Sequence, residues 1–115
     1  MRFVHLLKGD PFSWKAHEAL RIATATAINA ETYFVCIRDG VYVLTHWKPE
    51  ALGIEDFDRF WEAVELLDRF KVVAEEESLH ERGLIKTHLK VKRVEILPSE
   101  RIKELIRSAD FVAVW

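Results

Sequence analysis

The chain contains only one cysteine, Cys36, among its 115 residues. A single thiol cannot form an internal disulfide, and it cannot supply a metal site that needs two or more thiolates from the same chain. The five histidines are spread along the sequence, and no two of them stand four residues apart as helical metal ligands do. We therefore expect no bound metal.

Long apolar runs are also absent. No stretch approaches the ~20 residues that cross a bilayer, and the apolar run after Met1 and Arg2 is too short for the core of a secretory signal. Glutamine is missing and asparagine occurs once, whereas Glu, Lys and Arg are frequent. This thermophile-like composition is typical of hot-growing organisms.

From the lack of a long apolar run and of a signal core, we expect a cytoplasmic protein that makes no use of a membrane.

Neither sign of charge is in large excess, since 17 basic side chains stand against 19 acidic ones. The resulting net charge of −2 gives no general attraction to nucleic acid. A local basic stretch, residues 86–93, contains Lys86, His88, Lys90, Lys92 and Arg93. It holds no interleaved aromatic residue that could stack on bases, so we interpret it as a strand edge guarded by lysines. We expect no direct binding of nucleic acid.

Half of the residues are hydrophobic and 31% are charged, the balance of one ordinary domain over residues 1–115. Apolar runs predict strands at 3–7, 33–37, 71–74, within 87–97, and at 111–115. In the fourth of these the apolar phase slips, so a bulge or two short pieces are possible. Caps and helical spacing predict helices at 13–29, 54–70, 76–81 and 98–109. Strands alternating with helices predict an α/β fold with a mainly parallel sheet of about five strands.

Segment 54–70 has the clearest helical pattern of the chain. Its apolar side chains recur every three or four residues, at Phe57, Phe60, Trp61, Val64 and Leu67. The pairs Glu55 with Arg59 and Glu65 with Arg69 are spaced to interact along the outer face.

Segment 41–45 is ambiguous between an extension of the second strand and a short helix.

In a parallel α/β sheet, ligands bind at the carboxyl ends of the strands. The loops expected there hold the candidate cleft residues Lys8, Gly9, Asp10, Asp39, Gly40, Glu75 and Arg82. The sequence Lys-Gly-Asp-Pro at 8–11 lacks the glycine pattern of a dinucleotide-binding or phosphate-binding loop. We therefore expect no cofactor.

Three tryptophans are expected at or beside loops, namely Trp14, Trp47 and Trp115. Aromatic residues in such places either cover the core or anchor protein interfaces. We take them as interface candidates and expect an oligomer.

Four short segments resemble a known family in their order and spacing: residues 25–27, 34–41, 48–51 and 78–84 (Ser-Leu-His-Glu-Arg-Gly-Leu). Over nearly the whole chain they resemble the DsrE/DsrF-like sulfur-relay family, nearest its TusC or DsrF subunit type. The resemblance implies a three-layer α/β/α, flavodoxin-like fold. It also implies a cytosolic complex that passes persulfide sulfur between proteins, toward tRNA 2-thiouridine or in sulfur oxidation.

In the active subunit of that family a cysteine follows the third strand, at the start of a short helix that ends in Arg-Gly. The matching position here, seven residues before Arg82, is Glu75. The acceptor thiol is thus replaced by a carboxylate, which cannot carry a persulfide. The resemblance therefore implies a non-catalytic or accessory protein that works with other sulfur-relay subunits or with itself, as a hetero- or homo-oligomer.

Two other functions stay open. Cys36 could act as the nucleophile of a sulfurtransferase, although its position between Val35 and Ile37 in a predicted strand favours burial. Alternatively, the chain could be a small-molecule or RNA-binding module that kept the fold. The acidic run 75–77 could form a site of its own, but acidic residues are also what the first turn of a helix favours.

Overall fold

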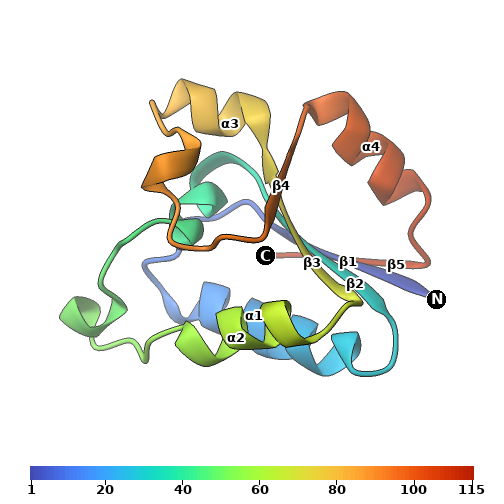
Figure 1. Cartoon of the computed structure of the whole chain (residues 1–115), viewed down its shortest axis with the longest axis horizontal. Coiled ribbons are helices and arrows are strands. Elements are labelled where there is room, and N and C mark those ends of the chain that lie inside the picture. The colour runs from blue at the N-terminus through green and yellow to red at the C-terminus, as the bar shows by residue number, and fades with distance from the viewer.

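The computed structural model describes the whole chain, residues 1–115, as strands alternating with helices (Figure 1). The strands are β1 (Arg2–Leu7), β2 (Glu31–Cys36), β3 (Phe70–Glu75), β4 (Val94–Leu97) and β5 (Phe111–Val114). The α-helices are α1 (Trp14–Ala27), α2 (Asp58–Leu66), α3 (Glu76–Glu81) and α4 (Ser99–Arg107). Three short 3₁₀ helices complete the chain: η1 (Arg38–Leu44), η2 (Pro49–Leu52) and η3 (Lys86–His88).

The five strands form one sheet in the order β4-β3-β2-β1-β5, and every neighbouring pair is parallel. The chain builds the sheet outward from β1 to β4 and then crosses back to place β5 on the other side of β1. The predicted α/β class and the parallel five-stranded sheet are confirmed.

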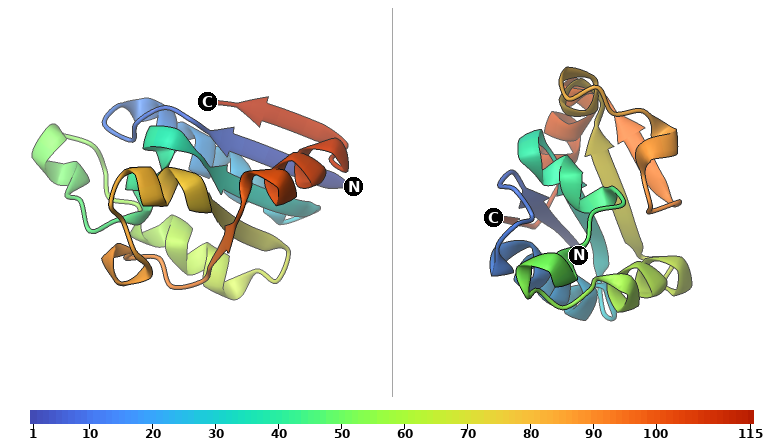
Figure 2. Two further views of the ribbon diagram at one scale, coloured as in Figure 1. Left: turned by 90° about the horizontal axis from the view of Figure 1, so that it is seen from above. Right: turned by 90° about the vertical axis from the view of Figure 1, so that its left-hand side faces the viewer.

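Helices cover both faces of this sheet, as the views from the front and from above show (Figures 1 and 2). Under α1 and α2 lies the larger core, which includes Leu7, Phe34 and Phe70. Under α4 lies a smaller core of Val4, Val35, Val73 and Ile102. The result is a three-layer α/β/α domain whose strands end together at one edge.

Helix α1 begins where the sequence predicts. The side chain of Ser13 accepts a hydrogen bond from the main-chain N–H of Lys15, 3.4 Å away, and caps the helix. The buried face of the helix is formed by Ala16, Ala19 and Ala23 together with Leu20 and Ala27. The four small alanine side chains allow the helix to pack close to the sheet.

The prediction of one helix over 54–70 is wrong at both ends. The Asp56 carboxylate accepts a hydrogen bond from the N–H of Asp58 at 3.0 Å and delays the start of α2 to that residue. Beyond Leu66 the backbone is extended at Leu67 and turns into β3. The pair Glu55–Arg59 forms at 3.3 Å, whereas Glu65 and Arg69 make no ion pair because the helix has ended.

The other uncertain segments are resolved as short pieces. Segment 41–45 belongs mostly to the 3₁₀ helix η1 and does not extend β2. Only 94–97 of the region 87–97 forms a ladder strand, while Leu89 makes an isolated antiparallel bridge with Thr45.

None of the helices has both the length and the apolar character needed to cross a membrane.

Candidate functional site at the carboxyl edge of the sheet

Glu75 is the last residue of β3 and leads directly into α3. One of its carboxylate oxygens accepts a hydrogen bond from the Ser78 hydroxyl, and the other accepts one from the Ser99 hydroxyl at 2.9 Å. Ser78 belongs to α3 and Ser99 is the first residue of α4. A single half-buried carboxylate thus joins the end of β3 to the first turns of both helices.

The same network reaches β2 and the neighbouring carboxylate. The Ser78 hydroxyl accepts a hydrogen bond from the main-chain N–H of Arg38, 2.7 Å away, just beyond β2. The carboxylate of Glu77 accepts from the main-chain N–H of Ser99 at 3.0 and 3.1 Å, and these bonds lower the pKa of Glu77. Glu75 and Glu77 of the acidic run are therefore both engaged with Ser99 and fasten the start of α4 to α3.

Arg38 has a backbone φ of 51°, the only positive value at a residue other than glycine. The left-handed conformation costs a side-chain-bearing residue roughly 1–2 kcal/mol. Its N–H is held by Ser78, so the strained turn is anchored to α3. Strain of this kind persists where surrounding contacts fix it.

Asp39 and Arg82 lie together at this edge, as expected. The guanidinium of Arg82 is 2.9 Å from the Asp39 carboxylate and also donates to the main-chain oxygen of Ser78 at 3.1 Å. This pair links η1 to the end of α3. With Glu75, it forms one connected polar cluster.

Gly40 lies beside these residues but is closed to any ligand. A Cβ atom at this position would stand 2.1 Å from the main-chain oxygen of Leu7 in β1. The residue is buried, and its N–H donates to the oxygen of Ile37 at 2.9 Å. Gly40 therefore permits close packing of η1 on β1.

Lys8, Gly9 and Asp10 make their contacts elsewhere. The N–H groups of Lys8 and Gly9 donate to the main-chain oxygen of Trp115 at 3.2 and 3.3 Å. The Asp10 carboxylate accepts from the N–H of Phe12 at 2.9 Å. These contacts tie the loop after β1 to the C-terminus, not to the Glu75 cluster.

Cys36, the only thiol, is completely buried in β2, with Leu7 of β1 and Ala74 of β3 as its register partners. Burial raises its pKa far above the ordinary value. The reactive form of cysteine is the thiolate, so this side chain behaves as a small hydrophobic residue.

The interface candidates occupy different environments. Trp14 is largely exposed at the start of α1. Trp47 packs edge-on against Phe12 and Phe57, and its ring N–H donates to the oxygen of Val43 at 3.3 Å. Trp115 packs against the larger core. An interface role stays a prediction for these residues.

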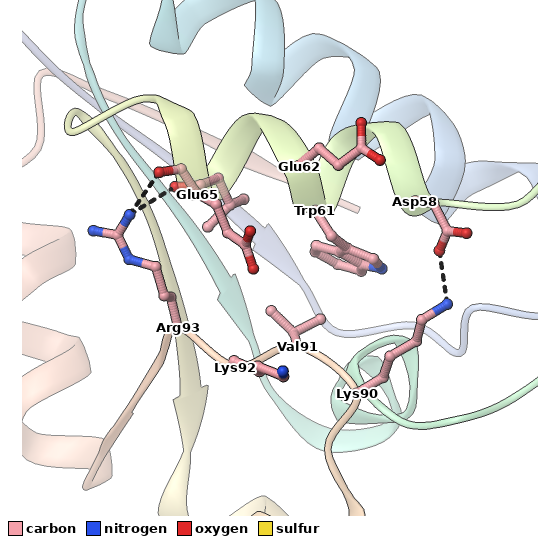
Figure 3. A pocket seen from close by; sticks show the side chains of 9 residues that line it. Asp58, Trp61, Glu62, Glu65, Lys90, Val91, Lys92 and Arg93 are labelled. Atoms are coloured by element: carbon pink, nitrogen blue, oxygen red, sulfur yellow. Dashed lines mark hydrogen bonds and ion pairs between the residues drawn. The ribbon is translucent and has the colours of Figure 1, made fainter.

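Residues 90–93 of the basic stretch form one wall of a groove of about 310 Å³ beside α2 (Figure 3). Lys90 pairs with Asp58 at 2.7 Å, and Arg93 donates to the main-chain oxygen of Glu65 at 2.9 Å. Trp61 lies between these contacts. Two of the basic side chains thus hold their segment against α2, which leaves less free positive charge for a nucleic acid.

The histidines and acidic side chains form no metal site. No three His, Cys, Asp or Glu side chains gather closely enough to hold a metal ion. His5 is buried in β1 with its Nε2 3.2 Å from the Thr26 hydroxyl, and desolvation lowers its pKa. His5 is therefore a buried packing residue of β1.

The sequence places Arg38 and Ser78 in segments at this end of the sheet without singling them out as site residues, and it does not place Ser99 there. A signal for Ser99 exists: parallel pairing places Leu97 beside Glu75, so Ser99 must follow close by. In the sequence Arg-Asp-Gly at 38–40, a positive φ is expected at the glycine. The positive φ lies at Arg38 instead, and Gly40 is needed because its backbone packs directly against Leu7.

A parallel sheet with helices on both faces and a polar cluster at its carboxyl edge is the arrangement of doubly wound α/β domains. Residues 1–113 match the model of the DsrE/DsrF-like family, and the chain belongs to that family. The crystal structure of the YchN protein from E. coli is similar, with a TM-score of 0.78 and 24% identity over 100% of this chain and 99% of the other. That likeness supports the fold. No curated protein matches the sequence.

Proposed function

We propose that this protein is a non-catalytic or accessory DsrE-like member of a cytoplasmic sulfur-relay assembly, of the TusC or DsrF type, serving tRNA 2-thiouridine formation or sulfur oxidation. One observation carries the proposal. The position that the family resemblance gives to the acceptor cysteine holds Glu75, a carboxylate fixed by Ser78 and Ser99.

The chemistry of sulfur relay supports this assignment. Persulfide transfer needs an accessible sulfur nucleophile, and thiolate is the reacting species. The carboxyl edge carries Asp39, Glu75 and Arg82, none of which can hold sulfur as a persulfide. The remaining contribution of such a subunit is its surface, through which it binds other relay subunits or a second copy of itself.

The alternative of a sulfurtransferase based on Cys36 gains no support from the geometry. The thiol has no exposed surface and a raised pKa, so neither a donor nor an acceptor can reach it in the folded protein. A small-molecule role for the groove beside Trp61 is likewise not favoured, because Lys90 and Arg93 are already engaged within the chain.

The proposal is tested by offering sulfur to the purified protein. Incubation with a cysteine desulfurase and cysteine, followed by intact-mass spectrometry, is expected to show no added sulfur. A persulfide would add ~32 Da. Such an adduct on the wild-type protein that disappears in Cys36→Ser would establish thiol chemistry and contradict the proposal.

A further inference from the structure

β5 is an edge strand that the helices leave uncovered. It stands last in the sheet order, with β1 as its only neighbour. Neither hydrophobic core includes any of its four residues. Phe111, Val112 and Val114 are 53%, 43% and 55% exposed, so apolar side chains on both faces of the strand meet solvent.

The outer edge of β5 also presents unpaired main-chain groups. Trp115 uses both of its groups toward β1 and its following loop, because its N–H donates to Leu6 and its oxygen accepts from Lys8. Inward and outward residues alternate along a strand in a parallel pair. Ala113 therefore bonds inward like Trp115, and Val112 and Val114 direct their N–H and C=O groups outward.

The two edges of the sheet differ in charge. β5 contains no charged residue, and the carboxylate of Asp110 just before it accepts a hydrogen bond from the N–H of Arg2. The opposite edge, β4, carries the exposed Glu95 and follows Lys92 and Arg93. Charged residues of this kind protect edge strands from pairing, and β5 lacks them.

We propose that β5 is a dimerisation strand that pairs antiparallel with β5 of a second copy, about a two-fold axis that passes between the two Ala113 residues. This register places Val112 of one copy opposite Val114 of the other. Both residues direct their free main-chain groups outward, so each such pair exchanges two hydrogen bonds. The two sheets become one continuous sheet, and like faces stay on the same side.

The occupant is a second copy bound through the same strand. A β5 strand docking on the β4 edge of another copy would bring an uncharged apolar strand against Glu95, Lys92 and Arg93. That head-to-tail contact would also continue into an open chain of subunits. Pairing β5 with β5 joins two neutral apolar strands and covers the outer edge of β5 in both copies. The assembly then stops at a dimer, because neither copy has a second β5 edge to offer.

Light scattering at micromolar concentration tests the interface. We expect the wild-type protein to have twice the monomer mass of 13.5 kDa. Val114→Pro removes an outward N–H that the chain itself does not use, and edge strands tolerate proline there. The variant should fold, by circular dichroism, and halve the mass. The control Leu66→Lys, at an 81% exposed apolar residue in α2, should leave the mass unchanged.

The register is tested by a disulfide across the axis. Opposed residues that do not exchange hydrogen bonds lie about 4.5 Å apart at Cα, within the range that disulfides span. Ala113→Cys should therefore give a covalent dimer under mild oxidation, while the buried Cys36 of the wild type should not. A monomeric wild type, an unchanged mass in Val114→Pro or no covalent dimer would each overturn the proposal. A dimer is expected whether or not the protein serves a sulfur relay, so the two proposals can fail separately.

Discussion

Gly40→Ala is expected to remove at least about 3 kcal/mol of stability, and it can prevent folding altogether. The new Cβ would stand 2.1 Å from the Leu7 oxygen and 2.8 Å from its carbonyl carbon, both main-chain atoms in the central strand. A flexible side chain could move aside, but the main chain of β1 cannot, because it is hydrogen-bonded to β2 on one side and to β5 on the other. Urea unfolding followed by tryptophan fluorescence measures the loss.

Gly53→Ala is the matched control for this variant. Gly53 has a φ of 72°, and a Cβ atom added there would meet no atom within 4 Å, so it tests backbone strain alone. We expect a loss of roughly 1–2 kcal/mol from the left-handed conformation. An equal or smaller loss in Gly40→Ala would contradict the packing role assigned to Gly40.

The second large effect concerns the reactivity of Cys36. In the native protein, alkylation by iodoacetamide should be slower than in the urea-unfolded chain by a factor on the order of 10³ or more, because the thiol is reached only through opening of the sheet. Its burial and raised pKa act in the same direction. Mass spectrometry of quenched samples gives both rates.

Leu66→Cys combined with Cys36→Ser provides an exposed thiol for comparison, since Leu66 is on the surface of α2. This variant should react in the native protein nearly as fast as in the unfolded chain. Native alkylation of wild-type Cys36 at a similar rate would show that β2 opens readily, and it would reinstate Cys36 as a candidate nucleophile.

The order of predicted strands and helices is enough to predict the fold. The two can be told apart because a strand covered on both faces is a continuous apolar run, whereas a helix with one apolar face has apolar residues every three or four positions. The pattern fails at the C-terminal end of α2, where Leu67 and Phe70 continue the apolar spacing although Leu67 is extended and Phe70 begins β3. Side-chain capping by Asp56 and the distant Arg93 decides the two ends of α2. Periodicity does not report such contacts.

The sequence is enough to predict that the candidate site lies at the carboxyl ends of the strands, but not which side chains are bonded to one another there. Topology brings Asp39, Glu75 and Arg82 to one end of neighbouring strands, and the sequence order alone implies this. Hydroxyl partners such as Ser78 and Ser99 depend on side-chain geometry at two helix starts, which no spacing rule specifies. For the same reason the sequence grouped Lys8 and Asp10 with residues that they do not contact.

The most direct test of the central claim places a thiol at position 75. Glu75→Cys, incubated with a cysteine desulfurase and cysteine, should gain ~32 Da as a persulfide, while the wild type and the matched control Glu75→Ser gain nothing. Circular dichroism should show all three folded, because Glu75 is only half-buried. Added sulfur on Glu75→Cys alone would support a relay position that this chain has lost. Added sulfur on the wild type, or none on a folded Glu75→Cys, would contradict that account.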